Sequence, residues 1–158
     1  MKTPRRTHIA ACTTRLRKPG SEVQLFPAGV FRARDGRPEG IPGWTMDAAA
    51  ARQVIGRAEQ RTTPFVIDYE HQTLYAETSG NPAPAAAWFT RLEWREGDGL
   101  YATDVEWTAR AAALIEGDEY RYLSPVFRFD PNTGVVTELL MAAVTNNPAI
   151  DGIADVAA

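Results

Sequence analysis

A histidine and a serine, far apart in this sequence, have the types and settings that nucleophilic catalysis requires. His71, one of two histidines, follows the apolar run at residues 65–67. Ser124 is the one serine of three that falls within a strong strand pattern, "EYRYLSPVFRFD" at 119–130. A serine hydroxyl is a weak nucleophile until a base takes its proton, and histidine titrates near neutral pH. The pair could therefore serve as nucleophile and general base.

Carboxylates next to His71 extend this chemistry. Asp68 and Glu70 alternate in the stretch "FVIDYEHQT" and could share one face of a strand. A third group normally fixes the tautomer of a catalytic imidazole, and either acid could do so. As paired acids for glycoside cleavage they would need a partner across the site. Residue types alone still favour an ordinary interpretation, a surface histidine and a strand serine bonded to backbone.

The residue after Ser124 restricts the strand that carries it. Pro125 has no N–H, so we expect this strand to lie at a sheet edge or to be locally distorted. Distorted strands often re-aim a side chain, which would suit a nucleophile.

Strand and helix patterns predict the elements that must position these residues. Strand patterns cover 23–31, 65–70, 87–96, 100–107, 119–130 and 135–145, with turns at 96–99 and 131–134. An alanine-rich helix follows Thr45, which we expect to cap it, with Ala50, Val54 and Ala58 on one face. Thr108 caps a second helix that Gly117 ends.

Because the strands arrive as hairpins, the predicted fold is α+β. We expect a mainly antiparallel sheet or partly closed barrel, flanked by two or more helices. Residues 1–22 are expected to form a flexible arm with at most one strand, residues 23–153 a single domain, and residues 154–158 a tail.

Composition argues against several other classes of protein. The net charge of −3 disfavours a nucleic-acid surface, and no apolar run is long enough to cross a membrane. Two histidines and one cysteine, far apart, argue against a metal site, and no cofactor-binding motif is present.

Several longer stretches resemble the Mu-like phage I proteins, which are head-maturation proteases. These stretches are "FPAGVFRARDGRP", "VIDYEHQT", "APAAAWFTRLEWREGDGLYATDVEWTARAAALI", "EYRYLSPVF" and "AAVTNNPAIDG", and the resemblance as a whole covers about residues 23 to 153. More distantly, the chain resembles prohead proteases and herpesvirus assemblins. The resemblance implies a protease fold of that class, with His71 as base and Ser124 as nucleophile.

The third catalytic member is less well defined by the resemblance. Prohead proteases carry an acid in a strand before a "PA" motif, and Pro148-Ala149 is that motif here. The expected position falls near Leu140 or Met141, so Glu138 is the nearest acid; Asp68 and Glu70 are the alternatives, and assemblins use a second histidine.

The resemblance also implies a biological setting. Such proteases work inside the procapsid in the host cytoplasm, cut scaffold and major capsid proteins, and cut themselves; by analogy with assemblins we expect a weak homodimer. A C-terminal scaffold region, which Mu-like I proteins often carry, is absent from this chain. The alternative function is a non-catalytic scaffolding protein of the procapsid that retains the fold.

Overall fold

The chain folds into three β-sheets and three helices within the residues that the structure describes. The computed structural model describes residues 14–16, 18–32 and 36–146, together with the backbone of residues 8–11. The strands are β1 (His8–Ala11), β2 (Thr14–Arg15), β3 (Val23–Pro27), β4 (Gly29–Phe31), β5 (Trp44–Met46), β6 (Phe65–Tyr69), β7 (Ala85–Phe89), β8 (Leu92–Arg95), β9 (Gly99–Ala102), β10 (Glu106–Trp107), β11 (Tyr122–Phe129) and β12 (Val136–Thr145). The helices are α1 (Ala48–Glu59), α2 (Gln72–Ser79) and α3 (Ala109–Glu116).

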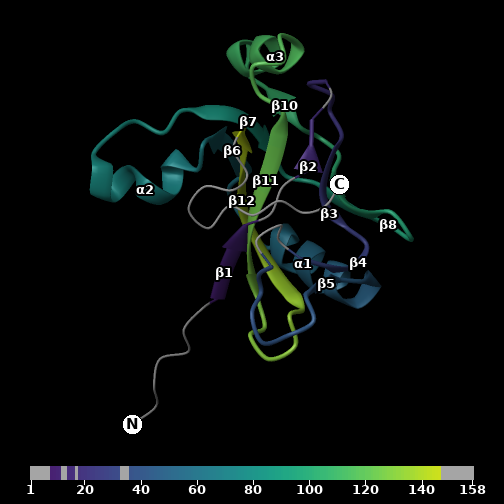
Figure 1. The fold of residues 1–158 in the computed structure, drawn as a ribbon. Coiled ribbons are helices and arrows are strands. Elements are labelled where there is room, and N and C mark those ends of the chain that lie inside the picture. The colour runs from purple at the N-terminus through teal and green to yellow at the C-terminus, as the bar shows by residue number, and fades with distance from the viewer. Residues whose placement is uncertain (1–7, 12–13, 17, 33–35, 147–158) are drawn as a thin grey trace.

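A curled mixed sheet forms the body of the molecule. Its strand order is β1-β11-β12-β6-β7-β10, with β2 also pairing with β11. The pairs are antiparallel except that β12 and β6 run parallel. The sheet curls into a half-barrel, against which the sheet β3-β9-β8 and helix α1 pack (Figure 1). The predicted α+β class, with a partly closed barrel flanked by helices, is confirmed.

One face of the main sheet carries the hydrophobic core. Phe127 on β11 makes edge-on contacts with Phe26 and Trp44 at centroid distances of 5.1 and 5.3 Å. Helix α1 packs on β12 through the face that includes Ala50, Val54 and Ala58, as their spacing predicted. Burial of this aromatic and aliphatic surface is the main stabilising term for the fold.

Local signals predicted both ends of α3 correctly, but they placed the cap of α1 at the wrong residue. Thr108 Oγ1 accepts the N–H of Ala111 at 3.2 Å, so the predicted cap of α3 is confirmed. The predicted cap of α1 at Thr45 is wrong, because Thr45 lies in β5 and pairs with β4. Asp47 caps α1 instead, and its Oδ1 accepts the N–H of Ala50 at 2.8 Å.

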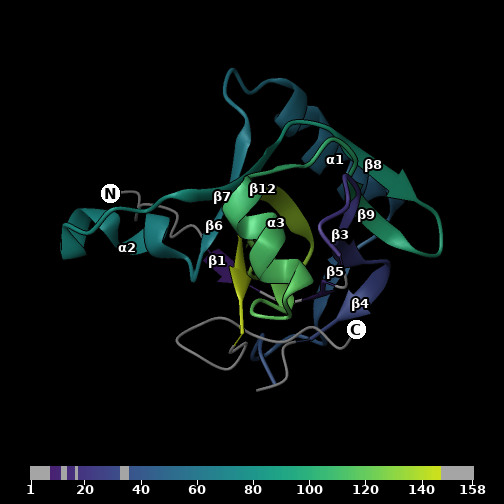
Figure 2. The same cartoon turned by 90° about the horizontal axis from the view of Figure 1, so that it is seen from above.

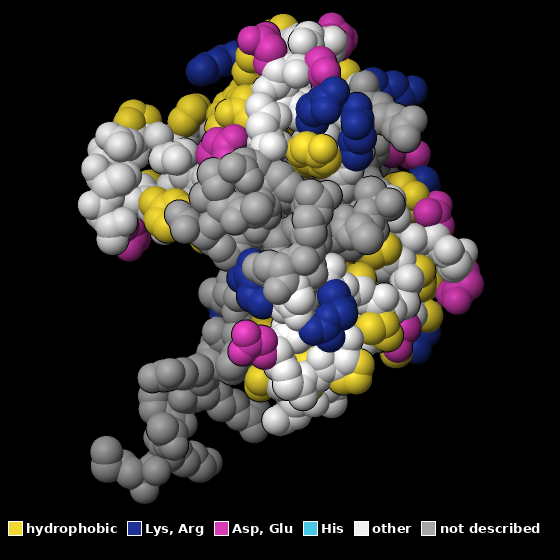
Figure 3. Space-filling model, viewed as in Figure 1, with side chains coloured by type: hydrophobic (Ala, Val, Ile, Leu, Met, Phe, Trp, Pro, Cys, Tyr) yellow, Lys and Arg dark blue, Asp and Glu magenta, His cyan; other side chains and the backbone are white. Residues whose placement is uncertain are grey.

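Helix α2 was not predicted. No residue of α2 is buried, so its sequence lacks the apolar stripe that marks a helix packed on a core. Both views place α2 on the side of the main sheet away from α1 and from the sheet β3-β9-β8 (Figure 1, Figure 2). Leu74 and Tyr75 are exposed on this projection, where apolar side chains are visible in Figure 3.

The N-terminal part of the chain contributes to the main sheet. Strands β1 and β2 both pair with β11, so the described part of residues 1–22 contains two short strands rather than the one at most that was expected. The predicted tail at 154–158 and the Pro148-Ala149 motif lie outside the described residues.

Two glycines provide a test of the turn that joins β11 to β12. Gly134 has φ +81°, and an added Cβ would lie 2.0 Å from the carbonyl oxygen of Gly43. Gly56, within α1, has no atom within 4 Å of such a Cβ. We expect Gly134→Ala to lower the free energy of unfolding by at least about 1 kcal/mol and Gly56→Ala to raise it by about 0.5–1 kcal/mol. Urea denaturation measures both, and equal effects would contradict the described turn.

Candidate active site

Three neighbouring strands bring Ser124 and Asp68 into one row. Ser124 on β11 pairs with Ala143 on β12, and Ala143 pairs with Asp68 on β6. Directly paired residues point to the same face of a sheet. Neighbouring strands lie about 4.8 Å apart, so the Cα atoms of Ser124 and Asp68 are about 10 Å apart. Only the methyl group of Ala143 stands between them.

This row lies on the face of the main sheet opposite the aromatic core. Leu123 and Val144, one position away along each strand, belong to the main core, whereas Val126 and Met141 form a separate cluster. Since side chains alternate between faces, Ser124 and Ala143 share a face with Val126 and Met141. We call this face, which carries Ser124, Ala143 and Asp68, the site face.

His71 enters at the end of β6 through an unusual turn. Glu70 and His71 have φ values of 56° and 57°, in the left-handed region that residues with a Cβ rarely adopt. The turn folds back over Asp68, whose Oδ2 accepts the N–H of Thr73 at 2.7 Å. Such conformations cost about 1–3 kcal/mol each and cluster at functional sites.

Ser124, Asp68 and His71 together hold most of the unsatisfied buried polar atoms in the described part of the chain. Six buried side-chain atoms there lack a hydrogen-bond partner, and four of them are Asp68 Oδ1, His71 Nδ1 and Nε2, and Ser124 Oγ. Ser124 and Asp68 are 0% exposed and His71 is 1% exposed. Each unsatisfied buried group costs about 1–3 kcal/mol, so a cluster of them requires a functional explanation.

Burial sets the protonation of the histidine and the aspartate. It lowers the pKa of His71 to about 4, which leaves the imidazole neutral and able to accept a proton at neutral pH. It raises the pKa of Asp68, against the opposing effect of hydrogen bonds from Thr73 and the backbone N–H of His71. No hydrogen bond joins the His71 ring to Ser124 or Asp68 in the described structure.

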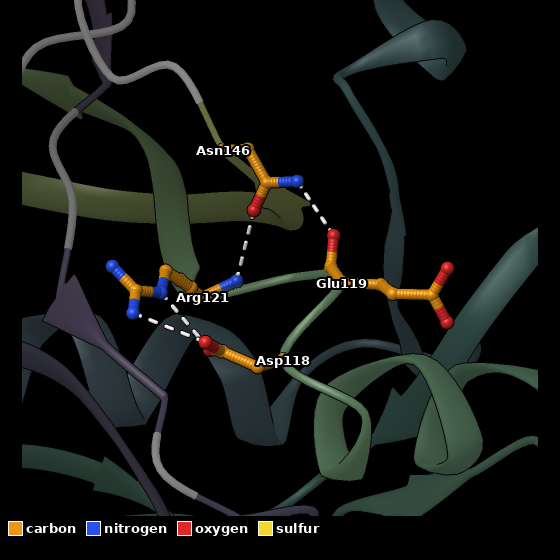
Figure 4. Close-up of polar contacts among 4 residues, drawn as sticks. All are labelled: Asp118, Glu119, Arg121 and Asn146. Atoms are coloured by element: carbon orange, nitrogen blue, oxygen red, sulfur yellow. Dashed lines mark hydrogen bonds and ion pairs between the residues drawn. The ribbon is translucent and has the colours of Figure 1, made fainter.

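A polar latch fixes the start of the strand that carries Ser124 (Figure 4). Asn146 Oδ1 accepts the N–H of Arg121 at 3.0 Å, and its Nδ2 donates to the carbonyl of Glu119 at 2.6 Å. The Arg121 guanidinium donates to both carboxylate oxygens of Asp118. The latch therefore ties the loop before β11 to the end of β12, next to the row of Ser124 and Asp68.

Glu138, the sequence candidate for the third member, lies away from this row. It is five residues before Ala143 on β12, a distance of about 16 Å along the strand. Its Oε1 pairs with Arg128 at 3.2 Å and with Arg57 of α1 at 3.6 Å. The structure thus does not bring Glu138 to Ser124, whereas it brings Asp68 into the same row.

Glu70, the other alternative, is near the row but bound elsewhere. Its Oε2 accepts the hydroxyl of Thr145 at 3.0 Å, two residues beyond Ala143 on β12. The side chain of His8, on β1, is not among those described.

The strand of Ser124 differs in one respect from expectation. β11 is not an edge strand, because β12 pairs with it on one side and β1 and β2 on the other. The alternative, a local irregularity, is confirmed by a register shift between Val126 and Phe127. Ala143 was missed as a site residue, since only the pairing of the three strands reveals its place.

Comparison with known proteins identifies the family. Residues 23–157 match the family model described as "Mu-like prophage I protein, N-terminal domain". The chain belongs to the Mu-like prophage I protein family. No solved structure matches it at a significant level.

Two curated relatives align along most of this chain. It is 36% identical over 156 residues to the Mu-like prophage FluMu I protein of Haemophilus influenzae, covering 94% of this chain and 43% of that protein. It is 40% identical over 137 residues to Protease I of Escherichia phage Mu, covering 82% of this chain and 38% of that protein. The chain thus spans about two fifths of the length of these relatives.

The described residues offer neither a cluster of metal ligands nor a membrane-spanning helix. No group of three or more His, Cys, Asp or Glu side chains there could hold a metal ion. None of the helices in the described ranges is both long and apolar enough to span a membrane.

The depressed pKa of His71 makes the stability of the fold depend on pH. Between pH 6.5 and about 4 the unfolded chain binds a proton at this residue that the folded chain excludes, so stability falls as pH falls through this window. The full effect is up to about 3 kcal/mol. Urea unfolding of the wild type and of His71→Asn, chosen because asparagine tolerates positive φ, measures it across pH 4.5–7.5.

The comparison isolates His71 because Asp68 is present in both proteins. The raised pKa of Asp68 acts in the opposite sense. The folded state keeps a proton on this carboxyl that the unfolded chain releases above pH 3.8, so this group lowers the stability of the fold as pH rises. We expect the wild type to lose stability relative to His71→Asn on acidification. Parallel stability curves for the two proteins would rule out the neutral, buried imidazole.

Proposed function

We propose that this protein is a serine endopeptidase of phage head maturation, with Ser124 as nucleophile, His71 as base and Asp68 as the third member. Its substrates are the scaffold and major capsid proteins and the protein itself, inside the procapsid in the host cytoplasm. Membership of the Mu-like I protein family and the name Protease I of the phage Mu relative support a protease. The observation that carries the catalytic assignment is the shared row of Ser124 and Asp68 beside a buried, unpartnered His71.

The spacing of the row suits a serine, histidine and carboxylate in series. Two hydrogen bonds of about 2.8 Å and the width of an imidazole place the outer oxygens about 7–8 Å apart. Side chains on one face, with Cα atoms about 10 Å apart, can meet that requirement. Ala143, between them on β12, has only a methyl side chain, so little side-chain bulk separates the outer residues. In the proposed catalytic state the His71 ring lies between Ser124 and Asp68, where its two nitrogens form the hydrogen bonds that they lack in the structure.

In this mechanism His71 removes the proton of Ser124 as Oγ attacks the carbonyl carbon of the peptide bond. The imidazolium then gives that proton to the leaving amine, and water hydrolyses the acyl-enzyme with His71 again as base. Ionised Asp68 stabilises the imidazolium and fixes its tautomer. The neutral resting state of His71 fits its role as proton acceptor.

Backbone groups beside Ser124 are poorly placed to hold the oxyanion. Pro125 has no N–H. The carbonyl of Val144 accepts the N–H of Glu70, so the backbone polar groups of Val144 face β6. Because backbone groups alternate in direction along a strand, those of Ala143 face β11, and the N–H of its partner Ser124 is directed toward Ala143. We therefore infer that the oxyanion donors come from another segment, which substrate binding brings to the site.

A non-catalytic structural protein is the alternative, and one observation favours it. Ser124 and His71 are closed to solvent and not hydrogen bonded to each other. For the protease, this arrangement is a resting state that must open before substrate reaches Ser124. Labelling with a serine-directed phosphonate separates the two functions, since only the protease incorporates one label per chain at Ser124.

Replacing the nucleophile should separate activity from stability. We expect Ser124→Ala to lower self-cleavage and cleavage of scaffold by at least about 10³-fold. It should leave the free energy of unfolding unchanged or raise it by about 1 kcal/mol, because an unsatisfied buried hydroxyl is removed. Mass spectrometry measures cleavage, and Ser79→Ala, at an exposed serine, is the matched control. Processing at the wild-type rate by Ser124→Ala would refute the nucleophile.

Two acid-to-amide substitutions discriminate between the candidates for the third member. Asp68→Asn keeps an acceptor for the Thr73 N–H but removes the charge that stabilises the imidazolium, so we expect kcat to fall at least about 100-fold. Glu138→Gln loses only ion pairs with Arg57 and Arg128, and kcat should change less than about threefold. Single-turnover cleavage measures both, and the reverse order of effects would assign the role to Glu138.

A further inference from the structure

The site face is apolar on one side of Ser124 and carries an acidic residue on the other side. Residues two apart on a strand share a face and lie about 6.6 Å apart, so each row has a neighbour on both sides. The row of Val126 and Met141 follows in one direction, and Val66, two residues before Asp68 on β6, packs against it. The row of Tyr122 and Thr145 follows in the other direction, and a hydrogen bond continues it to Glu70.

The row on one side of Ser124, which we call the apolar row, consists of Val126, Met141 and Val66. Val126 and Met141 are buried at 1% and 5% exposure and form a cluster separate from the main core, with Val66 packed against it. No polar side chain belongs to this row. A group that binds above it must be apolar, because a polar group would lose its hydrogen bonds to water.

The second, the acidic row, is Tyr122, Thr145 and Glu70. Glu70 is partly exposed and forms no ion pair with any other described residue, although its Oε2 accepts the Thr145 hydroxyl. Burial first, and then the negative charge of Glu70, raise the pKa of the nearby Tyr120 hydroxyl. Arg110 lies 5.4 Å above the ring of Tyr69 rather than on this carboxylate. No cation of the described residues therefore neutralises the Glu70 carboxylate.

Once the site face opens to substrate, an extended peptide that runs along the strands would meet both rows at once. It advances about 3.3 Å per residue, so side chains one or two residues from the bond above Ser124 reach the rows on either side. One flank of the cleaved bond then contacts the apolar row and the other contacts the acidic row.

On the basis of the proposed function, we propose that these two rows set the specificity of cleavage. The substrate class is a peptide segment with an aliphatic side chain on one flank of the cleaved bond and lysine or arginine on the other. Met141 and Val126 select the aliphatic side chain, and Glu70 selects the cation. Neither Met141 nor Glu70 exchanges protons with the substrate, so both act on selection rather than on the chemical step.

Profiling of cleavage sites in a peptide library tests this assignment. The full-length protein is incubated with the library, and mass spectrometry gives the residues on each flank of every Ser124-dependent cut. We expect aliphatic residues within two positions on one flank and basic residues within two positions on the other. Two matched peptides, with lysine or its neutral isostere norleucine at the basic position, then give a ratio of kcat/KM values.

Variants assign each preference to its row. Glu70→Gln should lower the lysine-to-norleucine ratio about tenfold, whereas Glu138→Gln, an acid at the far end of β12, should leave the ratio unchanged. Met141→Ala should shift the aliphatic preference toward larger side chains. Leu139→Ala, which opens a cavity on the core face of the same strand, should not shift it.

The outcomes separate this proposal from the proposed function. Ser124-dependent cleavage without these flanking preferences, or an unchanged ratio in Glu70→Gln, overturns the specificity assignment and leaves the protease intact. An equal loss on both matched peptides in Glu70→Gln also overturns it and points to a role in the chemical step. Cleavage that persists in Ser124→Ala, or its absence in the wild type, overturns both.

Discussion

The parallel pairing of β12 with β6 is the constraint on which the candidate site depends. Without it, Ser124 and Asp68 would belong to hairpins with no fixed relation, because 56 positions separate them in sequence. The register of this pair is specified by burial of the opposite face, where Ile67, Ala142 and Val144 enter the core. A slip by one residue would turn Asp68 into that core and Ile67 out of it, at a cost of several kcal/mol. The hydrophobic core therefore fixes the geometry of the polar row on the other face.

The local structure around His71 works against stability. Two successive left-handed residues, a buried imidazole, a buried carboxylate and a buried hydroxyl occur within one small region. Each would be selected against in a purely structural sheet, where apolar residues of similar size would fit without unsatisfied polar atoms. Their coincidence at the end of one strand is the pattern expected where function is retained at the expense of stability.

Much of this arrangement could be predicted from the sequence, because its signals are local. The rarity of serine and histidine singled out Ser124 and His71, and turn and cap residues such as Thr108 and Gly117 marked element ends correctly. The parallel pairing could not be predicted, since it joins segments far apart and leaves no local pattern. For the same reason the sequence ranks Glu138 by its distance along the chain from the Pro148-Ala149 motif and not by its distance from Ser124 in space. Asp68 is closer to Ser124 in space although it is farther in sequence.

The cost of burying charge also explains why the site is closed in the structure. A neutral imidazole and a protonatable carboxylate are compatible with burial, whereas the imidazolium formed during catalysis is not, unless an ionised partner lies beside it. His71 and Asp68 without a mutual hydrogen bond therefore represent a low-charge resting arrangement. A peptide that opens the site face and brings oxyanion donors would favour the paired, charged arrangement that the reaction requires. If the proposed function holds, coupling catalysis to substrate in this way would keep the enzyme inactive until a suitable peptide occupies the site face.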